Sequence, residues 1–208
     1  MARKTKAGAA LTRDRIVTSA RTAFCRAGVA NTSLEEIAKD AGVTRGAVYW
    51  HFRNKADLFM ALRTQTGTLL RLGEFKEGDA LQRLETGLLN ALHRLQDDAQ
   101  ARETYEVILW KCEYVGEFAE VRTDLMAAGQ IFIREATDLY AEAVRAGLTV
   151  PDLNSAWAAL ETFSVYVGIL KLWLADPSGQ HFRPNAAAMI SQHIASKRCA
   201  LERPRKPY

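Results

Sequence analysis

The segment "TSLEEIAKDAGVTRGAVYWHFRNKADLF", residues 32–59, decides the fold. Its first apolar residues recur three and four positions apart, the spacing of one helix face: Leu34, Ile37, Ala38 and Ala41. Gly42 then favours a helix stop, and Thr44 favours a new helix start at Arg45. Two short helices joined by the turn "GVT" are typical of a helix-turn-helix unit.

The second of these helices, Arg45 to His51, carries more rings than one packed face can hold. Successive helical residues point about 100° apart, so Val48 and Phe52 share one side and are expected to pack inward. The outward side carries Gly46, Ala47, Tyr49 and Trp50, with His51 at its edge. A solvated helix face normally carries Glu, Lys or Gln instead. The pattern therefore predicts a face that a partner covers.

Charge and side-chain chemistry indicate that this partner is DNA. Residues 1–60 carry 11 Lys and Arg against 5 Asp and Glu, whereas residues 61–208 carry 17 against 19. A basic first third is typical of an anion-binding module. The rings of Tyr49 and His51 can contact phosphate or sugar, and Arg45 can reach a guanine edge or a phosphate.

Two further positions are predicted to hold phosphates. Thr32 precedes the first helix of the segment, and Lys55 follows the capping residue Asn54 at the start of the next helix. Free backbone amides at a helix start bind anions, and a hydroxyl or an ammonium group beside them adds to that binding. The alternative is that Thr32 is only a cap and Lys55 only a solvated lysine.

The rest of the chain is also predicted to be helical, because no run of alternating residues and no hairpin signal occurs. Glycines and prolines stand where the helical patterns break. The expected helices cover about 12–27, 34–41, 45–51, from 54 onward, 80–97, 102–114, 119–146, 154–175 and 185–199.

Residues typical of catalytic and metal sites are sparse. The cysteines are three and widely spaced, so we expect neither a disulfide framework nor a metal site. The four histidines lack metal-ligand spacing, and there is no phosphate-cradling glycine loop or nucleophile elbow. We therefore expect no enzyme activity and no cofactor.

No membrane span is expected. The most apolar stretch, residues 156–175, is interrupted by Glu161 and Lys171. The basic start of the chain has no apolar core of the kind that a secretory signal needs. These patterns predict a cytoplasmic protein.

A helical protein that grips another protein through its aromatic face is the main alternative to DNA binding. The positive charge of residues 1–60 and the anion-binding helix starts argue against it. A gel-shift experiment with the DNA that flanks the protein's own gene separates the two.

Residues 32–59 resemble the DNA-binding signature of the TetR family of bacterial repressors. The matching positions are Ile37, Ala38, Ala41, Gly42, Val43, Thr44, Gly46, Tyr49, His51, Phe52, Lys55 and Leu58. The segment "EVILWKCEYVGEFAEVR", residues 106–122, and the opening "MARKTK" are similar to the AcrR-like branch, whose members repress RND-type multidrug efflux operons.

This resemblance implies an all-α fold of nine helices. Three helices form a helix-turn-helix DNA-binding domain, here residues 1–54. Residues 55–208 form a ligand-binding and dimerisation domain, whose first helix, about 55–72, acts as a connector. The last two helices are implied to form a homodimer interface.

The resemblance also implies roles for individual residues. Thr32 and Lys55 would hold phosphates of double-stranded operator DNA. The residues implied to contact operator DNA from the third helix are Thr44, Arg45, Gly46, Ala47, Tyr49, Trp50 and His51. A small apolar or aromatic effector would release the repressor. Regulation of a non-efflux gene, or activation instead of repression, stays open.

The effector site is predicted less sharply than the DNA-binding face. Apolar residues recur at helical spacing in two later helices, namely Tyr105 and Leu109, and Phe163, Tyr166 and Leu170. Comparable positions line an apolar pocket in relatives of the efflux branch. For each of these residues, a place in an ordinary hydrophobic core is an equal alternative.

Overall fold

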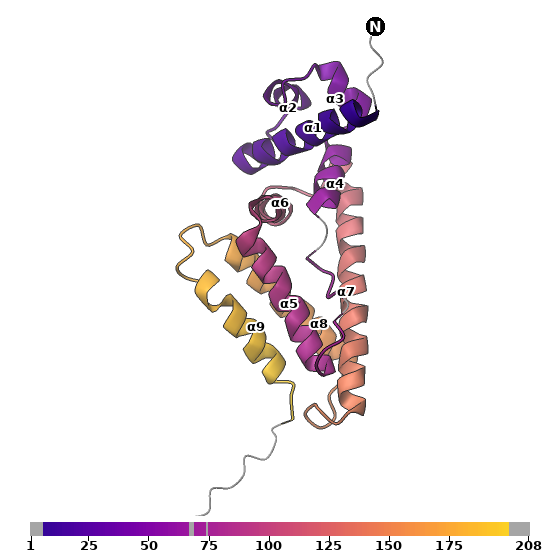
Figure 1. The fold of residues 1–208 in the computed structure, drawn as a ribbon, viewed down its shortest axis with the longest axis vertical. Helices are drawn as coiled ribbons and strands as arrows, with labels where there is room; N and C mark the ends of the chain where they lie inside the picture. The colour runs from indigo at the N-terminus through magenta and orange to yellow at the C-terminus, as the bar shows by residue number, and fades with distance from the viewer. Residues whose placement is uncertain (1–5, 67–68, 74, 200–208) are drawn as a thin grey trace, which may run out of the picture. The chain divides into compact units, whose positions relative to one another are not determined.

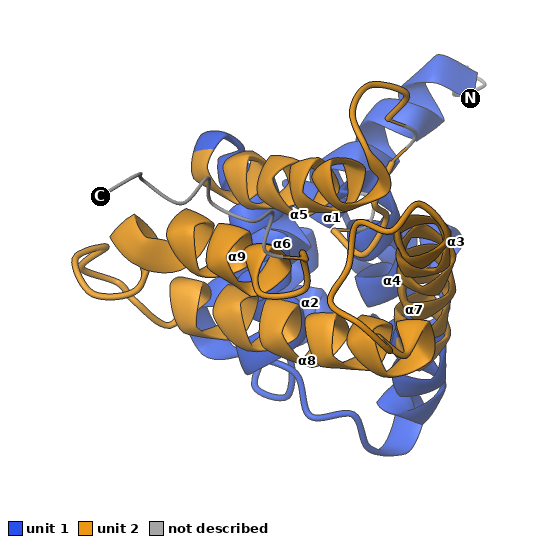
Figure 2. Cartoon of the chain, turned by 90° about the horizontal axis from the view of Figure 1, so that it is seen from below, with its two compact units in different colours: residues 1–68, 97–125 blue, residues 69–96, 126–208 orange. Residues whose placement is uncertain are grey.

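The computed structural model describes residues 6–66, 69–73 and 75–199, and it divides into two compact units. Unit 1 contains Met1–Thr68 and Asp97–Leu125, and unit 2 contains Leu69–Gln96 and Met126–Tyr208 (Figure 2). Within the described residues there are nine α-helices, two short 3-10 helices and no strand, so the all-α prediction is confirmed (Figure 1). Only Lys6 of the opening "MARKTK" lies within the described residues.

The helices of unit 1 are few and mostly short. They are α1 (Lys6–Ala27), α2 (Leu34–Asp40), α3 (Arg45–His51), α4 (Lys55–Thr66) and α6 (Ala99–Trp110), followed by the 3-10 turn η1 (Gly116–Phe118). Helix α1 packs against α2, α4 and α6 within this unit. It therefore provides the surface on which the helix-turn-helix segment is assembled.

Most helices of unit 2 are long. Its helices are α5 (Ala80–Asp97), α8 (Ser155–Leu174), η2 (Arg183–Asn185) and α9 (Ala186–Ala195). Helix α7 (Ala119–Arg145) begins in unit 1 and continues in unit 2. Helices α8 and α9 pack against each other.

Local hydrogen bonds and one glycine define the limits of the helix-turn-helix segment, and the predicted stop at Gly42 and start after Thr44 are confirmed. The Ser33 hydroxyl caps α2 by accepting the amide of Glu36 at 3.1 Å. Gly42 has a φ of +62°, the left-handed conformation that ends a helix. The Thr44 hydroxyl then caps α3 by accepting the amide of Ala47 at 3.2 Å.

The inward side of α3 is also as predicted. Val48 is fully buried and Phe52 is 2% exposed. On α1, the buried apolar face includes Ile16, Ala20 and Phe24. Helix α3 thus contributes an aliphatic and an aromatic residue to the core of unit 1.

The predicted limits of the sixth helix, 102–114, are wrong at both ends, because α6 covers Ala99–Trp110. The Asp98 carboxylate starts the helix early by accepting the amides of Gln100 and Ala101. At the other end, the Lys111 carbonyl accepts the amide of Val29 at 2.9 Å. This bond joins the end of α6 to the connection between α1 and α2.

Helix α8 is long and apolar enough to cross a membrane when length and composition alone are considered. In the structure, 44% of its most apolar window is buried inside the protein. A core helix of a folded domain meets the same criteria, so this helix is weak support for a membrane span.

The cysteines form no disulfide with one another. Cys25 on α1 is partly buried, and its Sγ lies 3.3 Å from the carbonyl oxygen of Glu103 on α6. Burial raises the pKa of the Cys25 thiol to about 12, and the carboxylates of Glu106 and Glu103 act in the same direction. The thiol therefore stays protonated and packs as a small side chain.

A polar chain connects α7, α8 and α9 inside unit 2. The Tyr140 hydroxyl lies 2.7 Å from the Thr162 hydroxyl, which lies 2.9 Å from Nε2 of His193. Burial lowers the pKa of His193 below its ordinary value of 6.5, and Lys197 adds to this shift while Glu161 opposes it. The neutral imidazole is therefore the form that the fold favours.

Replacing Phe52 by alanine should remove a buried ring from the core of unit 1. We expect a loss of about 3–5 kcal/mol in the free energy of unfolding, because the neighbours of a deleted ring relax only in part. Trp50→Ala is the matched control, since Trp50 is 72% exposed and its loss should change stability by less than about 0.5 kcal/mol. Urea unfolding followed by circular dichroism measures both, and equal losses would contradict the packing of α3.

His193 should give the chain a stability that falls with acid. Because its pKa is lower in the folded chain, the unfolded chain binds a proton first as the pH drops. The stability contributed by neutral His193 is present above about pH 6.5 and is lost as the pH falls through its folded pKa. Between about pH 7.5 and 5.5, the wild type should lose more unfolding free energy than His193→Gln. A parallel decline in the two proteins would show that His193 has no part in it.

Candidate nucleic-acid interface

The outward face of α3 presents small residues next to large rings. Tyr49 is 48% exposed and Trp50 is 72% exposed. Gly46 is also exposed, and a Cβ added there would meet only the Thr44 hydroxyl oxygen, at 4.0 Å. The Trp50 ring meets the His51 ring edge-on, with centroids 4.5 Å apart. The sequence prediction that these residues point away from the core is therefore confirmed.

Arg45 is held above this face by two neighbours. Its guanidinium carbon lies 5.5 Å from the centroid of the Tyr49 ring, one helical turn further along α3. Its Nη1 lies 3.8 Å from a carboxylate oxygen of Glu35 on α2. The Tyr49 hydroxyl and then the Glu35 charge raise the pKa of Arg45, so it remains a cation. A guanidinium fixed beside an exposed ring can donate to a base edge or a phosphate.

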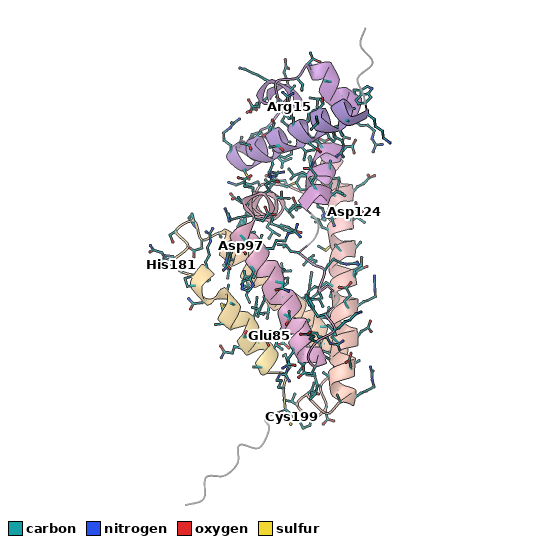
Figure 3. The ribbon with its side chains drawn as sticks, viewed as in Figure 1. Arg15, Glu85, Asp97, Asp124, His181 and Cys199 are labelled. Atoms are coloured by element: carbon teal, nitrogen blue, oxygen red, sulfur yellow. The ribbon has the colours of Figure 1, made fainter. Side chains whose placement is uncertain are left out.

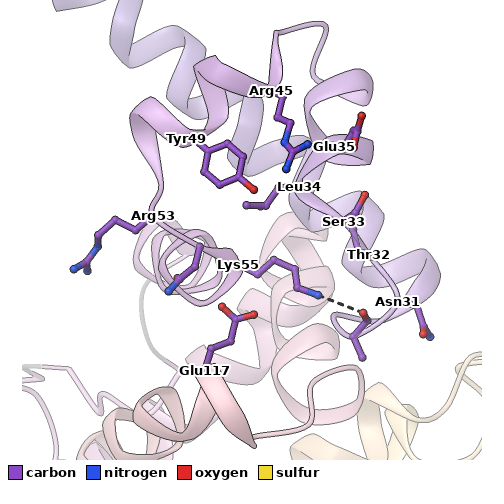
Figure 4. A pocket seen from close by; sticks show the side chains of 12 residues that line it. Asn31, Thr32, Ser33, Leu34, Glu35, Arg45, Tyr49, Arg53, Lys55 and Glu117 are labelled. Atoms are coloured by element: carbon purple, nitrogen blue, oxygen red, sulfur yellow. Dashed lines mark hydrogen bonds and ion pairs between the residues drawn. The ribbon is translucent and has the colours of Figure 1, made fainter.

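A groove of about 470 Å³ opens beside α3 (Figure 4). It combines three cations with two carboxylates, so it is basic but not uniformly so. Its lining includes Arg45, Arg53 and Lys55 as cations, Glu35 and Glu117 as carboxylates, and Ser33, Asn54 and Tyr49 as neutral donors or acceptors. Such a mixture suits a surface that places phosphates at defined points.

The Lys55 ammonium group donates hydrogen bonds to two backbone carbonyls of the protein itself. Its Nζ donates to the carbonyl of Val29 at 2.8 Å and to that of Ala30 at 3.3 Å, the latter contact drawn in Figure 4. An ammonium group has three donors, so one N–H stays available for a phosphate. Asn54 caps α4 beside it by accepting the amide of Asp57 at 2.8 Å.

Thr32 is placed differently from the sequence expectation. Its side chain is buried, with the residue 2% exposed, and its hydroxyl donates toward the carbonyls of Gly28 at 2.8 Å and Ala23 at 3.3 Å. Ser33, and not Thr32, supplies the cap of α2. The role of Thr32 in holding phosphate stays a prediction, and in this arrangement its hydroxyl faces α1.

Sequence reasoning did not identify three other residues of the groove. Glu35 faces Arg45, while Arg53 and Glu117 line the opposite side (Figure 4). Arg53 lies inside the segment 32–59, directly after Phe52, so its position was a usable signal. Glu117 comes from η1, more than 60 residues further along the chain, and no local pattern connects it to α3.

The residues predicted to line an effector pocket fall in both units. In unit 2, the Phe132 ring stacks on Tyr166 at 5.8 Å and packs against Phe163 at 5.6 Å, while Leu170 is buried on the same helix. In unit 1, Tyr105 is buried and Leu109 is partly buried on α6. The effector role of these residues stays a prediction.

Comparison with protein families decides the class of the chain. Residues 16–62 match the model of bacterial regulatory proteins of the tetR family. Residues 79–197 match the C-terminal region of MAATS-type transcriptional repressors. The chain belongs to the TetR family. The first match contains α2 and α3 whole, so the exposed face of α3 lies in the DNA-binding region of a transcriptional repressor.

Individual relatives of this TetR-family repressor are similar over most of their length. The HTH-type transcriptional regulator TtgR of Pseudomonas putida is 37% identical over 182 residues, covering 85% of this chain and 87% of TtgR. The HTH-type transcriptional regulator AcrR of Shigella flexneri is 34% identical over 202 residues, covering 92% and 91%.

A solved structure agrees with this relationship. NalD, the secondary repressor of the MexAB-OprM multidrug efflux pump in Pseudomonas aeruginosa, superimposes with a TM-score of 0.84 at 30% identity. The similarity covers 94% of this TetR-family chain and all of NalD. The nine-helix TetR fold predicted from the sequence is thereby confirmed.

Proposed function

We propose that this TetR-family repressor controls a multidrug efflux operon in the cytoplasm. It binds operator DNA as a homodimer and leaves it when a small apolar or aromatic compound binds. The observation that carries the DNA-binding part is the exposed face of α3, where Gly46, Tyr49 and Trp50 stand beside the Arg45 cation. The name of NalD, which is a repressor of an efflux pump, supports the choice of operon.

In the proposed complex, α3 enters the major groove of double-stranded DNA. Arg45 donates to a base edge, and Gly46 and Ala47 allow the backbone to come close. Tyr49, Trp50 and His51 pack on sugar, phosphate or a thymine methyl group. Thr44 and the remaining N–H of Lys55 lie on the phosphate side. A dimer places two such helices one turn of DNA apart, about 34 Å.

Helices α8 and α9 offer an apolar surface for the homodimer. Large apolar side chains are exposed on both helices, namely Trp157, Leu160 and Leu172 on α8 and Met189 on α9. Gly168 lies on the same side of α8 as Trp157 and has nothing within 4 Å of a Cβ position. Exposed apolar patches of this kind are typical of protein–protein interfaces.

The proposed effector acts by preferring one conformation of the repressor. A ligand shifts an equilibrium only by its difference in affinity for the two states. The stacked rings of Phe132, Phe163 and Tyr166, with Leu170, supply apolar surface in unit 2 that suits an aromatic compound. For Tyr105 and Leu109, on α6 of unit 1, contact with an effector stays a prediction.

Binding to DNA of known and of random sequence tests the proposal. We would select a duplex from a random library with the wild-type chain and compare it with a shuffled duplex. Arg45→Ala should weaken binding to the selected duplex about 5- to 150-fold, since a base contact is worth roughly that factor. Tyr49→Ala and Lys55→Ala should weaken both duplexes, because phosphate contacts are independent of sequence. Unchanged affinity in all three variants would overturn the interface.

Salt and a control variant complete this experiment. Between 50 and 200 mM salt the wild-type affinity should fall by at least about a hundredfold, because bound phosphates release counterions. Arg145→Ala, which removes a positive charge from unit 2, should leave binding to both duplexes within about twofold. Apolar aromatic compounds should release the selected duplex in the same assay, and polar compounds of equal size should not.

Replacing Trp157 by aspartate should separate the protomers. Trp157 is 71% exposed, so its loss leaves the folded protomer intact, while a charge in an apolar interface opposes association. Analytical ultracentrifugation should show a monomer, and binding to the selected duplex should weaken with it. Leu11→Asp on α1 is the control, since Leu11 is also exposed but lies in unit 1. A Trp157→Asp dimer would place the interface elsewhere.

A further inference from the structure

Two arginines of α1 reach the two ends of α3. Arg15, labelled in Figure 3, donates from Nη2 to the carbonyl of Ala41 at 2.5 Å and to that of Gly42 at 3.5 Å. These carbonyls belong to the turn that leads into α3. Arg13 lies with its guanidinium carbon 5.2 Å from the centroid of the Phe52 ring, and Phe52 is the residue that ends α3.

The turn before α3 offers Arg15 a fitted site. Its own backbone bonds run from Gly42 to the Lys39 carbonyl at 3.0 Å and from Val43 to the Ala38 carbonyl at 2.9 Å. These two bonds close α2 and leave the carbonyls of Ala41 and Gly42 for Arg15. A Cβ at Gly42 would come within 3.0 Å of Arg15 Nη2, so backbone and guanidinium are in close contact. The positive charge of the Arg15 guanidinium also interacts favourably with the C-terminal end of α2, where the helix dipole is negative.

The far end of α3 is held in another way. Phe52 has an extended backbone, with φ −139° and ψ 127°, and its ring is buried. Arg13 covers one face of this ring, where a cation is attracted by the π-electrons. Helix α3 has only seven residues, too few to be stable in isolation, so contacts at its ends decide its direction.

We propose that Arg13 and Arg15 are positioning residues for DNA recognition. They hold α3 at both ends against α1, and they thereby fix the direction in which Arg45 faces the base edges. They do so through contacts within the protein and without touching phosphate. This inference rests on the proposed use of α3 as the recognition helix.

A variant in which residue 15 no longer bonds the Ala41 and Gly42 carbonyls should discriminate less between the selected and the shuffled duplex. Arg15→Met removes the donors and keeps an unbranched apolar stem, and Arg15→Lys keeps a charge and donors. We expect Arg15→Met to weaken binding to the selected duplex by roughly tenfold or more, because misdirected base contacts lose a factor of about 5 to 150 each. Binding to the shuffled duplex should fall far less. Arg15→Lys should restore most of the discrimination, and Arg13→Met should reduce it less than Arg15→Met does.

Lys39→Met is the matched control for charge. Lys39 is an exposed cation of α2 close to the same turn, and within the described residues its side chain makes no hydrogen bond to the Ala41 or Gly42 carbonyl. Its loss should weaken both duplexes alike, so that the ratio of the two affinities is unchanged. Thermal unfolding of every variant, followed by circular dichroism, shows which of them are folded.

Three outcomes would overturn the inference. Equal weakening of the two duplexes by Arg15→Met would make Arg15 a phosphate contact. A lower melting temperature with an unchanged affinity ratio would make its role purely structural. If Arg15→Met does not fold, an unchanged affinity ratio in a folded Arg13→Met variant would likewise overturn the inference. Failure of the recognition helix itself is distinct, because Arg45→Ala would then leave binding to the selected duplex unchanged.

Discussion

The recognition segment depends on the burial of Val48 and Phe52. A helix of seven residues gains too little from its own hydrogen bonds to stand alone, so tertiary contacts must fix it. With these two side chains in the core, helical geometry turns Gly46, Ala47, Tyr49 and Trp50 outward. The exposed rings are therefore a direct consequence of which residues are buried.

The arrangement of charge in unit 1 follows from the same constraint. The sequence shows an excess of cations over residues 1–60, and this excess suggested anion binding as a whole. In the structure, several of those cations hold the protein together: Arg15 binds the turn before α3, and Arg26 pairs with Glu36 at 2.6 Å. Arg45 and Arg53 instead line the groove beside α3. Net charge predicts the class of partner, whereas the division between internal and external cations needs the fold.

The limits of a helix could be predicted from the sequence where residues close by in the chain determine them. The limits of α3 follow from Thr44 and from the apolar phase of Val48, all within a few residues of one another. The end of α6 was missed because a distant amide, that of Val29, takes the Lys111 carbonyl. The inward hydroxyl of Thr32 and the internal hydrogen bonds of Lys55 were also missed, because their partners are not adjacent in the sequence. Their partners are carbonyls at the end of α1 and just beyond it, which no local pattern identifies.

The backbone N–H and C=O of Val29, just after α1, form hydrogen bonds with residues at the ends of two other helices. Its amide binds the carbonyl at the end of α6, and its carbonyl accepts the first side chain of α4. The exchange of this single amide proton with solvent deuterium therefore measures how often the end of α6 separates from α1. One backbone position thus provides an internal reporter of motion around the DNA-binding helices, without any added label.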